Sequence, residues 1–196
     1  SSAASDVYKR QSHDSPSAGY LIRKRVDPSA IPASSSGTYK KRQGVLYRLA
    51  EAYLSYAESL YEYSVAMGTY TDNETEILDY INRVRYRAGI PQYGKGADQI
   101  PVTEAQLRDL IRRERRVELN CEADIRFDDL RRWKEAETAL NGKFYGMNAL
   151  AKSTERDEYY KRTLYQTRRF ISYWWPIPQD DIDKNTNLRQ LPGWWR

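Results

Sequence analysis

The feature that most constrains the fold is a stretch from Val45 to Gly68 in which apolar residues recur every three or four positions. This is the spacing of an amphipathic α-helix that buries one face. Glycine favours the left-handed conformation that ends many helices, so Gly68 marks the predicted stop. The pattern predicts a helix near residues 45–67. Its apolar positions are Leu46, Leu49, Ala50, Tyr53, Leu54, Ala57, Leu60 and Tyr61.

A second helix is predicted near residues 74–88, and Gly89 and Pro91 follow its last turn. A short polar turn, TYTDN, separates the two helices, so they should pack against each other in antiparallel orientation. Such a pair is typical of one unit of a tetratricopeptide-like helical repeat, although this chain contains no second copy. The inward positions of the second helix are Ile77, Leu78, Ile81, Val84 and Ala88.

A third helix is predicted near residues 103–121, because Thr103 followed by Gln106 fits a capping box at its start. The only cysteine of the chain, Cys121, falls on the apolar stripe and is predicted to be a small buried hydrophobic residue. The full stripe consists of Leu107, Leu110, Ile111, Val117 and Cys121.

Glu114 and Glu118 fall beside this stripe, where a carboxylate is costly unless it is paired. We expect them to form structural ion pairs with an arginine of the next segment, Arg126 or Arg131. A catalytic acid is the alternative interpretation. Neither a second acid nor a nucleophile accompanies the two residues in a motif, so the structural interpretation is preferred.

Residues 141–162 lose all periodicity and are predicted to form a loop, and loops of this length often carry function. One strand is predicted within residues 167–178, where Pro176 and Pro178 end it because proline cannot donate a hydrogen bond to a neighbouring strand. The tyrosines of the predicted loop are Tyr145, Tyr159 and Tyr160.

The N-terminal part has a different composition. Residues 1–19 are small, polar and aperiodic, which predicts disorder, and they also resemble translated linker sequence more than native protein. Residues 20–44 are predicted to be irregular with one short strand. The folded domain is therefore expected to span residues 45–196.

The composition argues against several classes of function. His13 is the only histidine, which argues against Ser-His-Asp or Cys-His catalysis and against histidine-rich metal sites. No apolar run reaches the roughly 20 residues of a membrane-spanning helix. The net charge is +5, but segments such as RRERRVE alternate in sign, which is typical of a salt-bridged helix face. We expect no enzyme activity, no cofactor and no nucleic-acid partner.

Three ordered motifs resemble the SusD/RagB family. PIPQDDIDKNTNLRQLPGW, from Pro176 to Trp194, is similar to the closing motif of that family. RLAEAYLSYAES, from Arg48 to Ser59, is similar to one of its helices. ERRVEL together with RFDDLRRW, from Glu114 to Trp133, is similar to a third block. Ala123, Thr186 and Leu191 depart from the family pattern, where glycine, proline and asparagine are usual.

The resemblance implies a mainly α fold, with a tetratricopeptide-like helix pair, further helices and a few short strands, as in the C-terminal part of such proteins. It also implies a glycan-binding surface lipoprotein of the outer membrane, which delivers oligosaccharide or another nutrient to a SusC-type TonB-dependent transporter, as in starch utilisation-like systems. Membrane attachment would then come only through a lipid anchor that is not present in this chain. A helical-repeat adaptor that binds protein and no sugar is the alternative.

The family blocks assign structural roles to several residues. We expect the closing motif to act as a C-terminal clasp, in which two acidic residues start a helical turn, Asn185 takes a left-handed exit and Leu188 plugs the core. The residues expected to be structural are Glu114, Glu118, Arg126, Asp129, Trp133, Pro176, Pro178, Ile182 and Leu188.

Two kinds of binding site are considered. Flat aromatic rings with a polar edge suit the apolar faces of sugars, and the candidate ligand-binding residues are Tyr145, Tyr159, Tyr160, Trp174 and Trp175. A calcium site is a weaker alternative, because carboxylate clusters suit hard cations. Its candidate ligands are Asp180, Asp181 and Asp183.

Overall fold

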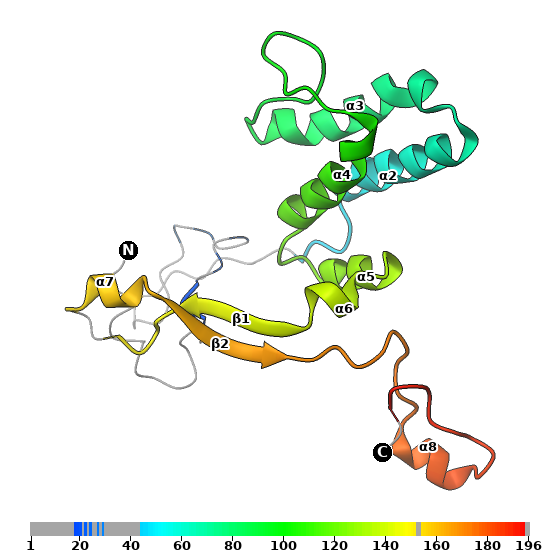
Figure 1. Ribbon diagram of the computed structural model, residues 1–196, viewed down its shortest axis with the longest axis vertical. Helices are drawn as coiled ribbons and strands as arrows, with labels where there is room; N and C mark the ends of the chain where they lie inside the picture. The colour runs from blue at the N-terminus through cyan, green and yellow to red at the C-terminus, as the bar shows by residue number, and fades with distance from the viewer. Residues whose placement is uncertain are drawn as a thin grey trace. The chain divides into compact units, whose positions relative to one another are not determined.

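The structure is a computed structural model that describes residues 18–20, 22, 24, 27, 29, 44–151 and 154–194. These residues form seven helices and two strands, so the predicted mainly α class is confirmed (Figure 1). The disorder expected at residues 1–19 and the short strand expected within residues 20–44 fall largely outside the described residues. Among the described helices, none is both long and apolar enough to cross a membrane.

The chain divides into two compact units. Residues 29–126 form the first, which we call the helical unit. Residues 1–28 and 127–196 form the second, which we call the hairpin unit.

Three helices build the helical unit: α2 (Leu49–Met67), α3 (Tyr70–Arg87) and α4 (Glu104–Glu118). Helices α2 and α3 form the expected antiparallel pair, and α4 contacts both (Figure 1). The predicted apolar faces meet in the core of this unit, so the three predicted helices are confirmed. The largest core cluster comprises Ala57, Tyr61, Ile77, Leu78, Ile81, Tyr93, Leu107 and Ile111.

The ends of the three helices confirm some sequence signals. Gly68 has a φ of 70° and caps α2 with a backbone N–H that points back to the last turn. The capping box of α4 also forms, because the Thr103 N–H donates to Gln106 Oε1 at 3.1 Å.

Other predictions at the helix ends are wrong. Leu46 precedes α2 and is 97% exposed, because the helix begins only at Leu49. The predicted turn TYTDN is almost entirely helical, since α3 starts at Tyr70 directly after the glycine reversal. Ala88 lies at the C-cap of α3 and is exposed.

Cys121 and Val117 are exposed, contrary to prediction. The reason is that α4 ends at Glu118, and Cys121 lies in the following turn with a φ of 60°. Ala123, which replaces the usual glycine of the family block, also has a positive φ of 42°. The turn therefore uses a backbone conformation in which glycine would be less strained.

The hairpin unit begins within α5 (Ile125–Arg132), which is followed by α6 (Ala136–Ala139). Strands β1 (Gly142–Met147) and β2 (Arg162–Arg168) then pair antiparallel, with an irregularity between Phe144 and Tyr145. The short helix α7 (Arg156–Tyr159) lies between the strands.

This hairpin corrects two predictions. The supposed loop at residues 141–162 contains a strand, and the strand predicted at 167–178 ends at Arg168. Two glycines and the register irregularity hide the alternation of β1, while every residue of β2 is exposed and therefore shows no apolar face.

The closing segment contains α8 (Gln179–Lys184), whose first turn carries Asp180 and Asp181 as expected. The side-chain amide of Gln190 closes the segment, because it accepts from the Ile177 N–H and donates to the Ile177 carbonyl, both at 2.9 Å. Trp194 Nε1 also donates to the Trp174 carbonyl at 2.6 Å. Hydrogen bonds of the Gln190 and Trp194 side chains thus hold the closing segment together.

The apolar part of the predicted clasp is different from the prediction. Leu188 is 37% exposed and does not plug a core, while Ile182 is half-buried. Asn185 is extended, with a φ of −132°, and does not take a left-handed exit. The hydrogen bonds between Gln190 and Ile177 connect the two sides of the segment instead.

Candidate functional site

The carboxylates of Glu114 and Glu118 on α4 pair with arginines that precede α4 in the chain. Glu114 forms an ion pair with Arg85 of α3, and both side chains are less than one tenth exposed. The Tyr93 hydroxyl donates to the same carboxylate at 3.1 Å. The expected pairing with Arg126 or Arg131 is therefore wrong for Glu114, because α4 packs its carboxylate face onto the helix pair.

Glu118 also points back to the preceding helices. It accepts from Arg48, which precedes α2, and from Arg87 at the end of α3. The Arg48 guanidinium binds Glu122 at 2.7 Å as well, and these carboxylates raise the pKa of Arg48 despite its partial burial. These pairs link the start of α2 and the ends of α3 and α4, in keeping with the structural role expected for Glu118.

The loop between α3 and α4 is anchored by a buried tyrosine. The Tyr93 N–H donates to Asn82 Oδ1, and Asn82 Nδ2 donates to the Tyr93 carbonyl, both at 2.8 Å. The Arg85 guanidinium lies 3.9 Å from the centre of the Tyr93 ring. Burial and the Glu114 charge together raise the pKa of the Tyr93 hydroxyl. This anchor fixes the loop beside α3.

Next to this anchor the loop turns sharply. Gly94 has a φ of 154°, and a Cβ there would overlap the side-chain amide of Gln99. The Gln99 Oε1 accepts from the Gly96 N–H at 2.9 Å. Lys95 extends from the same turn and pairs with Glu74 of α3 at 2.7 Å. Tyr93 and Lys95, on either side of Gly94, therefore both tie the loop to α3.

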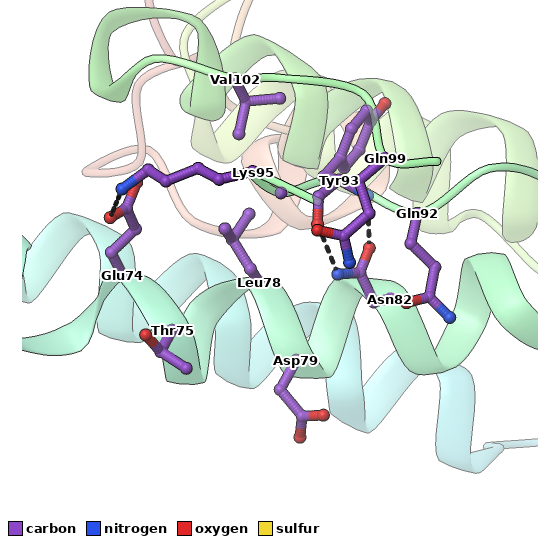
Figure 2. A pocket seen from close by; sticks show the side chains of 11 residues that line it. Glu74, Thr75, Leu78, Asp79, Asn82, Gln92, Tyr93, Lys95, Gln99 and Val102 are labelled. Atoms are coloured by element: carbon purple, nitrogen blue, oxygen red, sulfur yellow. Dashed lines mark hydrogen bonds and ion pairs between the residues drawn. The ribbon is translucent and has the colours of Figure 1, made fainter. Parts of the chain in front are cut away.

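A pocket of about 350 Å³ lies between this loop and α3. Figure 2 shows Lys95 reaching from the loop to Glu74, with Leu78 on the helix below. The lining residues are Glu74, Thr75, Leu78, Asp79, Asn82, Gln92, Tyr93, Gly94, Lys95, Gln99 and Val102. This volume lies near the lower end of the range of about 300–1,000 Å³ found for small-molecule sites.

The polar groups of the pocket are mostly neutral or already paired. Lys95 neutralises Glu74, and Arg83 neutralises Asp79 at 2.8 Å. Thr75 and the side chain of Gln92 have no hydrogen-bond partner within the described residues. Amides and hydroxyls both donate and accept, which suits a ligand rich in hydroxyl groups.

None of the aromatic residues predicted to bind ligand lines this pocket. Tyr145 lies on β1 and is 43% exposed, with the Arg162 guanidinium 4.2 Å from its ring centre. Tyr159 is half-buried, and its hydroxyl donates to the Gly19 carbonyl at 2.7 Å. Tyr160 is 55% exposed and packs edge-on against Tyr159. Tyr145 and Tyr160 therefore offer accessible rings, whereas Tyr159 supports the backbone.

The tryptophans lie near the closing segment. Trp174 and Trp175 are 61% and 65% exposed. Trp175 packs against Phe127 and lies under the Arg131 guanidinium, which is 4.6 Å from its ring centre. Trp133, predicted to be inside the fold, is half-buried.

The aspartates that were predicted to be structural or to bind calcium lie on α5 and α8. Asp129 is 3% exposed and binds Arg132 at 2.9 Å, in keeping with a structural role. Asp183 accepts from Gln179 Nε2 at 2.8 Å within α8. The part of the chain that the structure describes contains no group of three or more His, Cys, Asp or Glu side chains suited to a metal ion, so the calcium alternative gains no support.

The pocket could not be predicted from the sequence, because its polar residues follow no known motif. Asn82 and Gln92 are single amides on a helix and a loop, and no periodic pattern distinguishes them. One signal was available: the loop from Pro91 to Pro101 carries two glycines around a lysine, which is typical of a tight, ordered turn.

Several solved structures are similar to this chain. The structure is similar to a solved structure of the protein BT4246, with a TM-score of 0.73 and 33% identity over 92% of this chain and 30% of that chain. It is also similar to BF0978, a SusD-like carbohydrate binding protein of Bacteroides fragilis (TM-score 0.53, 35% identity, 74% of this chain and 28% of that one). A SusD-like protein of the same species, BF3747, shares 26% identity with a TM-score of 0.61, over 84% of this chain and 28% of that one.

The model of the SusD family matches residues 3–194, and the chain belongs to this family. The resemblance seen in the three sequence motifs is thus confirmed. No curated protein matches the chain. The chain spans less than a third of the length of the solved structures that it matches.

Proposed function

We propose that this chain is part of a glycan-binding component of an outer-membrane uptake complex, which delivers oligosaccharide to a SusC-type TonB-dependent transporter. The observation that supports this most is family membership over residues 3–194, together with 35% identity to a SusD-like carbohydrate binding protein. On this proposal the protein acts at the cell surface, binds its ligand and does not cleave it.

Within the chain, two features support sugar binding. The pocket beside α3 presents neutral amide and hydroxyl groups, including Thr75 and Gln92, for the hydroxyls of a neutral sugar. The exposed rings of Tyr145 and Tyr160 offer flat surfaces for the apolar face of a sugar ring. We propose the pocket and these rings as two separate sugar contacts, one in each unit.

Calorimetry with a panel of neutral oligosaccharides tests the proposal. The isolated chain should bind weakly, because each stacked ring contributes little and immobilising the ligand costs a comparable amount. Thr75→Ala combined with Gln92→Ala should reduce this binding at least about fivefold, since two hydrogen bonds to the ligand are lost. Thr71→Ala, an exposed threonine one turn earlier on α3, is the matched control and should leave binding unchanged.

A second variant tests the rings. Replacing Tyr145 and Tyr160 together by alanine should weaken binding of neutral oligosaccharides. Tyr159 is kept in this variant because its hydroxyl donates to the Gly19 carbonyl. Binding that survives both sets of substitutions unchanged would show that the sugar site lies elsewhere. Trp174 and Trp175 would then be the next residues to replace, because both are well exposed.

One observation favours the alternative of a protein-binding adaptor. Helix α2 also exposes large apolar side chains outside its buried face, including Leu49, Tyr63 and Met67, each more than half exposed. Exposed apolar side chains of this kind often contact another protein. A pull-down with a SusC-type transporter, compared with glycan affinity electrophoresis, separates the two functions: an adaptor would retain the transporter and show no shift with any glycan.

A further inference from the structure

Every exposed residue of α2 is uncharged. The charged residues of this helix are three glutamates, none of them exposed, and two of these, Glu58 and Glu62, pair with Arg115 and Arg108 of α4. In a chain in which 30% of the residues are charged, an exposed helix face without charge indicates a surface that contacts another protein chain. The exposed residues of α2 are Leu49, Tyr56, Ser59, Tyr63, Ala66 and Met67.

Large and small side chains alternate along this face. The large residues recur every seven positions and are Leu49, Tyr56 and Tyr63. A small residue follows each of them three positions later, and these are Ala52, Ser59 and Ala66. Positions seven apart lie two turns apart on nearly the same side of a helix. Such a seven-residue repeat is typical of a helix that packs along its length against another helix.

This alternation is complementary to itself when the helix meets a second copy in antiparallel orientation. A two-fold axis level with residues 57 and 58 places every large residue of one copy opposite a small residue of the other. Large side chains opposite small ones interdigitate without leaving voids. The pairs across the axis would be Leu49 with Ala66, Tyr56 with Ser59, and Tyr63 with Ala52.

We propose that the exposed face of α2 binds a second copy of this chain, as an antiparallel and two-fold symmetric helix pair. An identical copy suits the face because its large and small positions match and no like charges meet across the axis. Helix α2 has 19 residues and is therefore about 28 Å long. Its exposed side chains offer a contact area toward the lower end of specific interfaces, about 1,200 Å² in total, so we expect a weak dimer with a Kd of the order of 10 µM.

Sedimentation equilibrium of the full 196-residue chain measures this association. A reducing agent is present throughout, because the exposed Cys121 could otherwise link two molecules through a disulfide. Between about 1 µM and about 300 µM protein, the mean mass should rise from 23.0 kDa toward twice that value. Because the contact is apolar and uncharged, about 0.5 M sodium chloride should not weaken the association.

Ala66→Arg should raise the Kd of the dimer at least about tenfold, because a guanidinium would be buried against Leu49 of the second copy. Val117→Arg is the matched control, since it adds the same charge and removes an exposed apolar side chain, but on α4. It should change the Kd less than about twofold. Equal weakening by both variants would mean non-specific association and would overturn the assignment. A chain that stays monomeric at every concentration would also overturn it, and would leave the face to a different protein.

Cysteine cross-linking tests the antiparallel orientation. In a Cys121→Ser background, chains with Leu49→Cys are mixed with chains with Ala66→Cys and oxidised. A disulfide needs two Cα atoms within about 7 Å, and the proposed pairing brings positions 49 and 66 of different copies together.

Identical positions would instead lie about 25 Å apart along the helix axis in this arrangement. The mixture should therefore form at least about fivefold more covalent dimer than either variant alone. Efficient cross-linking of each variant with itself would show a parallel pair and overturn the assignment. None of these measurements involves a sugar, so their failure would leave the proposed function unaffected.

Discussion

Glu114 is a buried charged residue that neutralises Arg85 and accepts a hydrogen bond from the Tyr93 hydroxyl. Glu114→Ala should destabilise the protein by about 3–5 kcal/mol, because Arg85 would remain buried without a partner. Glu62→Ala is the matched control: it removes a carboxylate from the Arg108 pair, whose side chains are about two-fifths exposed, and should cost less than about 1 kcal/mol. Urea unfolding of both variants measures the difference, and equal costs would contradict it.

Tyr70 gives a prediction for alkaline conditions. Burial and then the charge of Glu74 raise the pKa of its hydroxyl to about 12. The pKa of this hydroxyl is higher in the folded state than in the unfolded state. The contribution of the protonated hydroxyl to the free energy of unfolding is therefore fully present below the ordinary tyrosine pKa and is lost as pH rises toward 12. The free energy of unfolding should fall between about pH 10 and 12. Tyr70→Phe should make that fall smaller, as measured by denaturant titrations across this range; an identical pH dependence would contradict the assignment.

At the scale of the elements, the loop between α3 and α4 depends on Gly94. Its φ of 154° strains any residue with a side chain, and a Cβ there would also displace the Gln99 amide. Gly94→Ala should therefore cost roughly 1–3 kcal/mol and disturb the pocket. Gly44→Ala is the control, because nothing lies within 4 Å of its position. Thermal unfolding compares the two, and a neutral effect at position 94 would mean that the loop rearranges easily.

The same elements show what the sequence could predict. The helices α2, α3 and α4 followed from apolar spacing, because each buries a single face in a common core. The hairpin of β1 and β2 could not be predicted in this way, because β2 is exposed along its whole length and has no apolar alternation. These partners of Glu114 and Glu118 were also missed, because they lie 21 to 70 positions earlier in the chain, and spacing along the chain carries no information on such contacts.

At the scale of the whole molecule, the two units differ in what stabilises them. Both hydrophobic core clusters of the described residues belong to the helical unit. The hairpin unit contains a two-stranded sheet, and isolated hairpins are at best marginally stable. A fragment of residues 44–126 should therefore unfold cooperatively with helical circular dichroism, whereas residues 127–196 alone should not. A cooperative transition in the second fragment, or none in the first, would contradict this.

The exposed turn that holds Cys121 has a practical consequence. Because the chain has no other cysteine, a thiol-reactive reagent should attach at one position per molecule without reducing agents or prior mutagenesis. This position belongs neither to the pocket nor to the hairpin. Molecules tethered there to a sensor surface would all have the same attachment point and leave both proposed binding regions unmodified. Weak sugar binding, which is hard to quantify in dilute solution, could then be measured at high surface density.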